Sequence, residues 1–475
     1  MELSLLQLVI IAATIAVVLG CGIYAARSVH SAEGFSLGGR SAGVPLVAGS
    51  IAGTCVGGGA TIGTAQLAST VGLSAWWFTI GVGLALIIMG IFYARPLRRS
   101  SLETIPQYLV QNYGRAGGVF TSVVSSLGIL FSAVSSCLPG IYIIAAVLAI
   151  PFWPAAGILL ALVACYAFFG GMKSAGVGGI LKMVVIWVSM LIAGGAAGYA
   201  VLFQPEIHEA LPADTWFNLF AGGMQMTLAN LVSVIVGMIC TQTYVQAIFS
   251  ATTPKTASVG AFVAALISLP IGLPCAMIGM YMHAAHPEVP AILALPTFLL
   301  SYQPVVLGSI AMGGIMLSLI GSTAGLSLGI GTMLSRDIFC KVLHVTKSAT
   351  ELWLTRGLVL ATIIVAAVIA VLNEGSQVLF WSYLSMALRG GGIFLPLTVA
   401  VFLPRAIERH WAVASMVIST CAALAANFLG VKVNPLFVGL AVSVVLIVPG
   451  ILQQRRRVAA LYARMKECGQ RDAVP

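Results

Sequence analysis

Arg389 is the residue of this sequence whose type and position point most directly to chemistry. It lies in an otherwise uncharged stretch from about Ser376 to Leu403, in a chain whose predicted membrane spans contain no Asp or Glu. At a rise of about 1.5 Å per helical residue, Arg389 lies roughly 20 Å from either end of that stretch, beyond the reach of a snorkelling side chain. An arginine left in hydrocarbon costs at least ~2.5 kcal/mol, so the guanidinium needs a partner inside the protein.

Three glycines, Gly390, Gly391 and Gly392, follow Arg389 and predict a backbone break beside it. A guanidinium at such a break binds a carboxylate with two parallel hydrogen bonds, so an organic acid or an amino acid is the expected ligand. Two other interpretations stay open: Arg389 bonds helix carbonyls, or it replaces an ion as a fixed cation. Neutral contacts to the same ligand are expected from nearby polar side chains, namely Cys55, Thr79, Gln225, Asn230 and Ser233.

A second candidate site lies in the apolar stretch from Val44 to Gly63, which contains the run Gly57-Gly58-Gly59. Each glycine costs a helix about 1 kcal/mol relative to Ala, and an unwound membrane helix is tolerated where its freed carbonyls line a cavity or bind a ligand. The run therefore predicts a break. The alternative is tight helix packing through small residues, since Gly53 and Gly57 are four apart.

Hydroxyl groups in another apolar stretch complete this candidate site. Ser318 and Ser322 are four residues apart and share one helix face. Together with carbonyls freed around Gly53 and Val56 they would form a small oxygen-lined site that suits a hard monovalent cation such as Na⁺. The alternative is that both hydroxyls bond back to carbonyls of their own helix.

The elements that position these residues are membrane helices. Of the 475 residues 60% are hydrophobic and only 8% are charged, and apolar runs long enough to cross about 30 Å of hydrocarbon recur throughout. The sequence predicts an all-α polytopic membrane protein with about 13 transmembrane helices, near residues 7–26, 44–66, 75–94, 117–148, 153–169, 177–203, 224–245, 257–284, 305–331, 354–373, 376–403, 411–430 and 434–453.

The loop charges predict the orientation of these spans. Basic residues follow the odd-numbered spans, at positions including Arg27, Arg95, Arg98, Arg115, Lys173, Lys255, Arg336 and Arg405, whereas Glu206, Glu209, Asp214, Glu288 and Glu374 lie on the opposite loops. Lys432 departs from the pattern. By the positive-inside rule the amino terminus is outside and the carboxyl terminus is cytoplasmic, in the plasma (inner) membrane. Lys182, near the cytoplasmic start of its span, is expected to snorkel to the inner surface as a structural residue.

Several segments together resemble the sodium:solute symporter family. They are Gly38-Gly39-Arg40-Ser41, the Gly53 to Gly63 region, Gly170-Gly171, Gln242-Thr-Tyr-Val-Gln246 and Ser335-Arg-Asp337-Ile-Phe339. The resemblance implies a leucine-transporter fold with a five-helix inverted repeat. It divides the single transmembrane domain (1–475) into an extra helix at 7–26, repeats at 44–203 and 224–403, two accessory helices at 411–453 and a basic tail at 454–475.

Within that family the shared sodium site is formed by two carbonyls of the second span and two oxygens of the ninth. These positions match the carbonyls of Gly53, Val56 and Ser318 and the hydroxyl of Ser322. Gly321 stands where relatives often have a further hydroxyl, which removes one ligand. Gly178 and Gly179 stand where several relatives have a Thr-Asp pair, so the shared site alone would couple Na⁺.

The string Thr54-Cys55-Val56-Gly57-Gly58-Gly59 is most similar to the choline-transporting branch of the family. That branch has an aromatic residue where Cys55 stands, and a quaternary amine needs an aromatic cage, so choline is disfavoured. Val234 and Gly237 occupy positions where sugar-carrying members place a polar contact and an aromatic gate, so a sugar is disfavoured too. A carboxylate or an amino acid remains.

The sequence therefore predicts a secondary active transporter that uses a Na⁺ gradient to carry a small organic solute by alternating access, with the lipid bilayer as its environment and no organic cofactor. The alternatives are a solute-sensing membrane receptor on the same scaffold, or uptake of a neutral solute that is proton-coupled or independent of cations. An enzyme is not expected, because the predicted spans offer no Asp, Glu or central His for acid, base or metal roles. A nucleic-acid partner is not expected, since the basic residues are divided among loops. The sequence leaves the oligomeric state open; a monomer is compatible with it.

Overall fold

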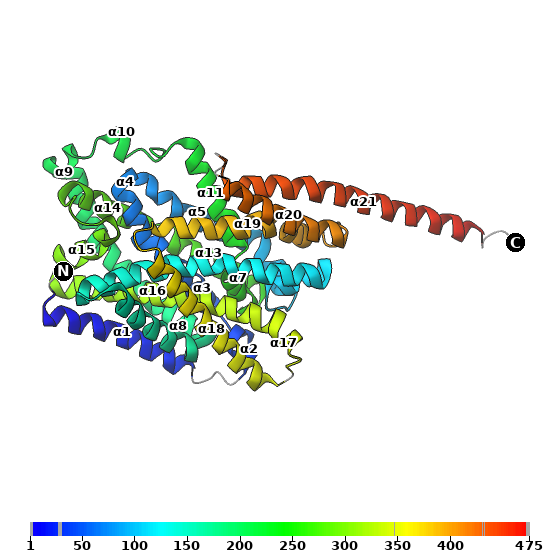
Figure 1. Cartoon of the computed structure of the whole chain (residues 1–475), viewed down its shortest axis with the longest axis horizontal. Coiled ribbons are helices and arrows are strands. Elements are labelled where there is room, and N and C mark those ends of the chain that lie inside the picture. Colours follow the sequence, from blue (N-terminus) through cyan, green and yellow to red (C-terminus); the bar gives the residue numbers. More distant parts are fainter. Residues whose placement is uncertain (1–2, 27–30, 346, 430, 432, 472–475) are drawn as a thin grey trace.

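The computed structural model describes residues 3–26, 31–345, 347–429, 431 and 433–471, and nearly all of them are helical (Figure 1). Arg27, Lys432 and residues 472–475 of the predicted tail lie outside the described residues. The α-helices are α1 (Leu5–Ala26), α2 (Ala32–Leu37), α3 (Val44–Cys55), α4 (Thr64–Val71), α5 (Trp77–Ile88), α6 (Ala94–Arg99), α7 (Ile105–Leu148), α8 (Phe152–Phe203), α9 (Pro205–Glu209), α10 (Ala213–Trp216), α11 (Met224–Ile239), α12 (Gln242–Ser250), α13 (Pro254–Ser268), α14 (Gly272–Ala285), α15 (Ala294–Ser301), α16 (Val305–Met333), α17 (Cys340–Val342), α18 (Ser348–Leu372), α19 (Val378–Phe402), α20 (Arg409–Phe428) and α21 (Pro435–Arg471).

Short 3₁₀ and π segments join several of these helices. They are η1 (Gly38–Arg40), η2 (Gly59–Gly63), η3 (Gly72–Trp76), η4 (Met89–Tyr93), η5 (Ala291–Leu293) and η6 (Leu334–Phe339). Among the described residues, eight helices are long and apolar enough to cross a membrane, or nine if the bent pair α11 and α12 forms one span. The all-α polytopic prediction is confirmed. The count of 13 spans stays a prediction, although all 13 predicted stretches coincide with helices and four shorter apolar helices add to the long ones.

Glycines mark the turns inside the two longest helical segments. Gly171 has a φ of 57° and interrupts α8, and a Cβ there would lie 2.6 Å from the carbonyl oxygen of Phe35. Gly114 has a φ of 78° and interrupts α7 in the same way. Only glycine takes such angles without strain, so the predicted boundary at Gly170-Gly171 between two spans has a steric cause.

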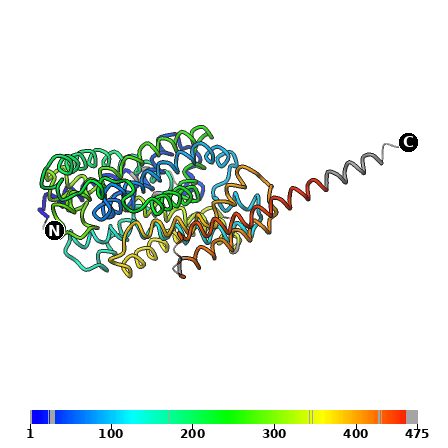
Figure 2. Tube along the Cα trace, turned by 90° about the horizontal axis from the view of Figure 1, so that it is seen from above, coloured from blue at the N-terminus to red at the C-terminus, as the bar shows by residue number. Residues whose placement is uncertain are grey.

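The centre of the bundle is built from α3, α7, α8, α16 and α19. Helix α16 packs against α7 and α8, α3 packs against α8, and α19 packs against α7 and α11. Of the membrane-spanning helices, α16 is the most buried, with 78% of its apolar window inside the protein. Helices α20 and α21 pair with each other and with α19 at one side, and α21 runs past the end of the bundle (Figures 1 and 2). Arg389, Gly53, Ser318 and Ser322 therefore lie on the inner helices.

Candidate functional site

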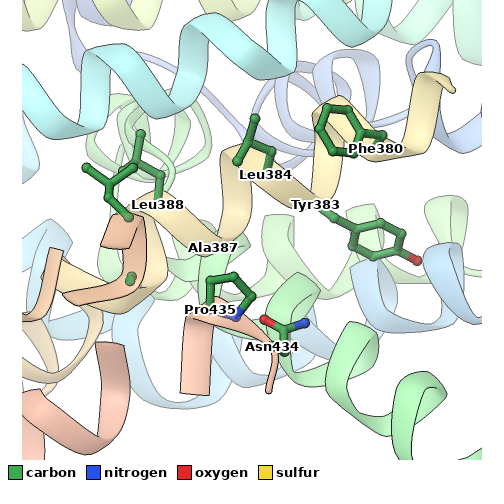
Figure 3. Close-up of a pocket in the computed structure, with 9 residues that line it drawn as sticks. Phe380, Tyr383, Leu384, Ala387, Leu388, Asn434 and Pro435 are labelled. Carbon is green, nitrogen blue, oxygen red and sulfur yellow. The ribbon is translucent and has the colours of Figure 1, made fainter. Parts of the chain in front are cut away.

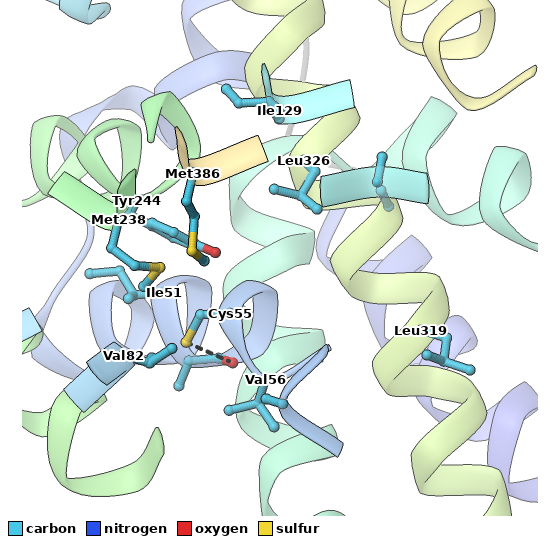
Figure 4. Packing of buried hydrophobic residues seen from close by; sticks show 14 of the residues in the cluster. Ile51, Cys55, Val56, Val82, Ile129, Met238, Tyr244, Leu319, Leu326 and Met386 are labelled. Atoms are coloured by element: carbon cyan, nitrogen blue, oxygen red, sulfur yellow. Dashed lines mark hydrogen bonds between the residues drawn. The ribbon is translucent and has the colours of Figure 1, made fainter. Parts of the chain in front are cut away.

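The helix that carries the first candidate site ends where the sequence predicts. Helix α3 stops at Cys55, and Val56 takes φ −81° and ψ 74°, which is not helical. A π-turn over Gly59–Gly63 follows, and the chain then continues into α4. Figure 4 shows Cys55 and Val56 at this end of α3, beside Tyr244, Met238 and Met386 from other helices. The predicted break is present, and the backbone leaves the regular helix after Cys55.

The three glycines at the break are also required by close packing. A Cβ on Gly57 would lie 2.5 Å from the hydroxyl oxygen of Ser322, and one on Gly58 would lie 2.4 Å from the carbonyl oxygen of Ser135. A Cβ on Gly59 would lie 2.8 Å from the hydroxyl oxygen of Ser382. Both interpretations of the run therefore apply, since the segment is interrupted and is packed against α7, α16 and α19.

The four residues predicted to bind sodium lie together at this break. The Ser318 hydroxyl donates a hydrogen bond to the Val56 carbonyl, and the Ser322 hydroxyl donates to the Gly53 carbonyl at 3.4 Å. Both serines are fully buried on α16. The hydroxyls thus bond across to α3, whereas the alternative was that they bond within their own helix. All of the gathered groups are oxygens, which is the donor set that Na⁺ prefers.

Lys182 reaches the same cluster. Its Nζ atom donates a hydrogen bond of 3.2 Å to the carbonyl oxygen of Ser318, and the residue is only 2% exposed. The expectation that Lys182 snorkels to the inner surface is wrong. The side chain turns inward because Gly53 and Gly321 leave room for it: a Cβ on Gly321 would lie 3.3 Å from Nζ, and one on Gly53 would lie 3.6 Å from Cε.

Arg389 is buried at a second interruption, between α11 and α12. Its Nη1 donates to the hydroxyl of Thr241 at 2.6 Å, and Thr241 lies at the junction where these helices bend by 45°. Nη2 donates to the hydroxyls of Ser132 at 3.3 Å and of Ser385 at 2.9 Å, and Nε donates to the Ser385 carbonyl at 3.1 Å. The guanidinium is thus bonded mainly to hydroxyls from three elements, in addition to one helix carbonyl.

The backbone break predicted beside Arg389 is wrong. Helix α19 continues without interruption through Gly390, Gly391 and Gly392. These glycines serve packing: a Cβ on Gly392 would lie 2.0 Å from the hydroxyl oxygen of Thr420, and one on Gly390 would lie 2.7 Å from a methyl group of Val236. A glycine triplet unwinds a membrane helix only where other groups accept the freed backbone, as they do at α3.

A small cavity of about 30 Å³ lies between the two interruptions. Its lining carries hydroxyls, aromatic rings and sulfur atoms and no charged side chain: Thr54, Cys55, Gly57, Gly59, Ala60, Phe78, Val82, Ser132, Ser135, Ser136, Met238, Tyr244, Leu326, Ser382 and Met386. The space admits a few water-sized groups at most, so the bundle is closed around its centre in this conformation. Ser132 both lines this central cavity and accepts from Arg389.

The predicted neutral contacts divide into one residue at the central cavity and four away from it. Cys55 lines the cavity and contacts the Ser268 hydroxyl at 3.2 Å. Thr79 is bonded to the carbonyl of Leu269, and Ser233 is bonded to the carbonyl of Ala229 in its own helix. Gln225 is exposed at the start of α11, and Asn230 is half-buried one turn further along. These four residues do not line the central cavity.

Sequence reasoning missed the serines of α7 and α19. Ser135 and Ser382 share a hydrogen bond of 2.9 Å, and Ser132 and Ser385 share one of 2.7 Å. Serines three or four residues apart in two apolar stretches were the available signal, because such residues lie on one helix face. What the sequence did not show is that the two faces meet.

A larger hollow of about 150 Å³ lies between α19, α20 and α21 (Figure 3). It is lined by apolar groups together with Tyr383 and Asn434, and it shares no residue with the central cavity. Neither buried cation lines it. It offers little to fix a polar solute, so the central cavity remains the candidate binding site.

The remaining family-like segments meet at the end of the bundle that is predicted to face the cytoplasm. Glu103 pairs with Arg336 at 2.7 Å and accepts from the Ser36 hydroxyl at 3.2 Å, and Arg336 also pairs with Glu351 at 2.9 Å. Gln242 donates to the backbone carbonyl of Glu103 at 2.9 Å. Burial raises the pKa of Glu103 above its ordinary value, and the Arg336 guanidinium offsets part of that rise. This inner cluster ties together the segments that precede α3 and follow α11 and α16.

Comparison with known structures identifies the fold. The fold matches that of a Na⁺-coupled sialic acid symporter in a substrate-bound outward-open state, with a TM-score of 0.77 over 96% of this chain and 98% of that chain at 16% identity. It also matches Mhp1, a nucleobase-cation-symport-1 family transporter, with a TM-score of 0.59 over 89% of this chain and 94% of that chain at 12% identity. The chain thus has the leucine-transporter-type fold of ion-coupled membrane transporters.

The family follows from the sequence comparison. The model of the sodium:solute symporter family matches residues 35–419, and this chain belongs to that family. It is 24% identical to the human high affinity choline transporter 1 over 65% of this chain and 56% of that protein, and 24% identical to the Drosophila melanogaster protein of that name over 74% of this chain and 60% of the other. It is 25% identical to the sheep sodium/glucose cotransporter 1 over 42% of this chain and 32% of that protein. The matches thus cover less than two thirds of these relatives' length.

Proposed function

We propose that this protein is a secondary active transporter that carries a small organic solute with a carboxylate group, an organic acid or an amino acid, by alternating access around the central cavity. Sodium is the coupling ion that family membership supports. The oxygens of Gly53, Val56, Ser318 and Ser322 are the place in this chain where it would bind. The solute would bind beside them, between α3, α7, α12 and α19.

The observation that carries the solute class is that two buried cations lie near an uncharged cavity without lining it. Lys182 lies behind the α3 break, and Arg389 lies behind Ser132. No ion pair with an acidic side chain joins either cation within the described part of the chain. Because charges in a low-dielectric interior act over several ångström, the field in the central cavity favours an anionic group.

The hydroxyls around the central cavity supply the direct contacts. Ser132, Ser135, Ser136 and Ser382 present hydroxyls that donate to carboxylate oxygens, while Phe78 and Tyr244 offer apolar faces to the rest of the solute. The Arg389 guanidinium, which already donates to Ser132, orients that hydroxyl. Arg389 thus acts on the solute through Ser132, since it does not itself line the cavity.

Alternating access requires that the two ends of the bundle open in turn. The inner cluster of Glu103, Arg336, Ser36 and Gln242 holds one end closed in this conformation. Its hydrogen bonds join α2, the segment before α7, α12 and η6, so opening that end separates these elements. The interruptions at α3 and at α11–α12 are the places where short helices tilt without disturbing a continuous hydrogen-bond ladder.

Uptake by purified protein in proteoliposomes tests this function. Radiolabelled carboxylates and amino acids are offered with an inward Na⁺ gradient, with an equal K⁺ gradient and with no gradient. We expect accumulation of a carboxylate-bearing solute, driven by the Na⁺ gradient. Accumulation of a neutral amine or sugar but no carboxylate would reject the solute class, and absence of any uptake or counterflow would reject the transporter.

A further inference from the structure

Lys182 occupies an unusual position for a membrane lysine. It lies on α8 with 2% of its surface exposed, and its Nζ donates to the carbonyl oxygen of Ser318 at 3.2 Å. That oxygen is one of the four proposed sodium ligands. The other three come from Gly53, Val56 and Ser322, which are joined by the Ser318–Val56 and Ser322–Gly53 hydrogen bonds where α3 ends against α16, and Gly53 also lies beside the Lys182 side chain.

The path of the lysine side chain is formed by missing side chains on both neighbouring helices. A Cβ on Gly53 would lie 2.6 Å from the Cα of Gly179 and 3.6 Å from the Lys182 Cε. A Cβ on Gly321 would lie 3.3 Å from Nζ. The absence of side chains at Gly53, Gly179 and Gly321 thus leaves the space through which the lysine side chain extends from α8 toward the oxygens.

The surroundings suit a cation in the same way that they would suit sodium. The carbonyl end of α3 is the negative end of its helix dipole, and it points at the cluster. An ammonium group has three N–H donors and no acceptor, so carbonyl and hydroxyl oxygens are its natural partners. No acidic side chain of the described residues pairs with Lys182. The carbonyl oxygen of Ser318 is the hydrogen-bond acceptor of the ammonium group.

We propose that Lys182 is a tethered competitor for sodium: in this conformation its ammonium group takes the place of the ion among the oxygens of Gly53, Val56, Ser318 and Ser322. Sodium binds there only after the lysine side chain has withdrawn. Two unit positive charges a few ångström apart repel strongly even at the dielectric constant of a protein surface, so the two cations exclude each other. The inference rests on the proposed function for the identity of the site and adds a residue that sets its sodium affinity.

Replacement of the lysine tests the competition directly. Lys182→Met keeps an unbranched side chain that is one atom shorter and removes the charge. The melting temperature of the purified protein is measured against rising NaCl, with NaCl and KCl held at a constant sum and no solute present, which reports sodium binding by its stabilisation of the folded state. We expect the Na⁺ concentration for half-maximal stabilisation to fall at least about tenfold relative to the wild type.

Two further variants make the measurement specific. Lys255→Met removes an equal charge from an exposed position and is expected to leave the sodium titration unchanged. Gly321→Ala places a methyl group 3.3 Å from Nζ, which displaces the amino group while the helix is retained, and is expected to lower the half-maximal Na⁺ concentration by a smaller factor. Gly321→Ala also decides the question should Lys182→Met fail to fold.

The inference is overturned if Lys182→Met folds and has the same or a weaker response to Na⁺ than the wild type, because the lysine would then not compete. It is also overturned if Gly321→Ala and Lys255→Met give equal titrations. These measurements need no solute. A gain of sodium affinity in Lys182→Met with no uptake of any solute would therefore support the competition while rejecting the proposed transport.

Discussion

The two predicted repeats of this protein each place one buried cation beside one interrupted helix. In the first, Lys182 of α8 lies at the end of α3 and bonds to Ser318 of α16. In the second, Arg389 of α19 lies at the junction of α11 and α12 and bonds to Ser132 of α7. The helix contacts follow the same scheme, since α8 packs against α3 and α16 while α19 packs against α11 and α7. The division into repeats at 44–203 and 224–403 stays a prediction.

The two cations differ in how firmly they are held. Lys182 makes one hydrogen bond, to a backbone carbonyl, from a flexible stem. Arg389 makes four, with three of its nitrogen atoms, and the planar guanidinium fixes their directions. An ammonium group held by one hydrogen bond is displaced by another cation, whereas a guanidinium held by four hydrogen bonds stays in place. The site at the first interruption is therefore the one that exchanges the Lys182 ammonium group for an ion. The Arg389 guanidinium at the second interruption stays in place.

Among the variants that test this comparison, replacement of Arg389 is expected to have the largest effect on melting temperature and uptake. Arg389→Gln removes most of the four hydrogen bonds of the guanidinium, so the hydroxyls of Thr241 and Ser385 lose this donor. A hydrogen bond to a charged group contributes about 1.5–3 kcal/mol, so we expect the loss of several to give a large fall in melting temperature and loss of uptake. Lys182→Met is the matched control, because an unpaired buried charge is itself unfavourable, and its melting temperature in K⁺ should stay close to that of the wild type.

Equal melting temperatures for Arg389→Gln and Lys182→Met in K⁺ would contradict the assignment of Arg389 as the fixed cation and Lys182 as the displaceable one. Uptake of a carboxylate by a folded Arg389→Gln protein at the wild-type rate would remove Arg389 from the solute site altogether.

The sequence predicted the fold class and the interruption of α3, because apolar runs and glycine runs are local signals. The set of sodium-site oxygens stays a prediction. The sequence did not predict where the side chains of Lys182 and Arg389 point. The direction of Lys182 depends on space left by Gly53 and Gly321, which are far apart in the sequence and adjacent only in the folded bundle. The partners of Arg389 come likewise from α7 and from the α11–α12 junction. Thr79, Gln225, Asn230 and Ser233 were chosen for their polarity alone, and polarity does not report which face of a helix meets a cavity.

The two glycine triplets allow a further comparison, between the interrupted helix α3 and the continuous helix α19. A Cβ on Gly58 would lie 2.4 Å from a backbone oxygen of α7, whereas one on Gly391 would meet its nearest neighbour, the Cβ of Ala423, at 3.5 Å. We expect Gly58→Ala to destabilise the protein by about 1–3 kcal/mol, as overpacking does, and to impair uptake. Gly391→Ala should be neutral or slightly stabilising, since alanine is the better helix former. Thermal unfolding of both variants measures the difference, and similar melting temperatures would show that the break at α3 adapts to a side chain.

The smallest expected effect concerns the inner cluster, whose Gln242 begins α12 and follows Thr241 at the second interruption. The pKa of Glu103 is raised by burial, so the folded protein holds this proton at a higher pH than the unfolded chain, whose glutamates titrate near ~4.3. The protonated form thus stabilises the fold at low pH, and this contribution is lost as the pH rises through the raised value. Glu103→Gln cannot titrate and should show a flatter decline of melting temperature over that window. Glu374→Gln, on an exposed turn, is the control and should keep the wild-type slope. Equal slopes for Glu103→Gln and the wild type would mean that the pairing with Arg336 cancels the effect of burial, and would place the closure of the inner end on the hydrogen bonds of Gln242 instead.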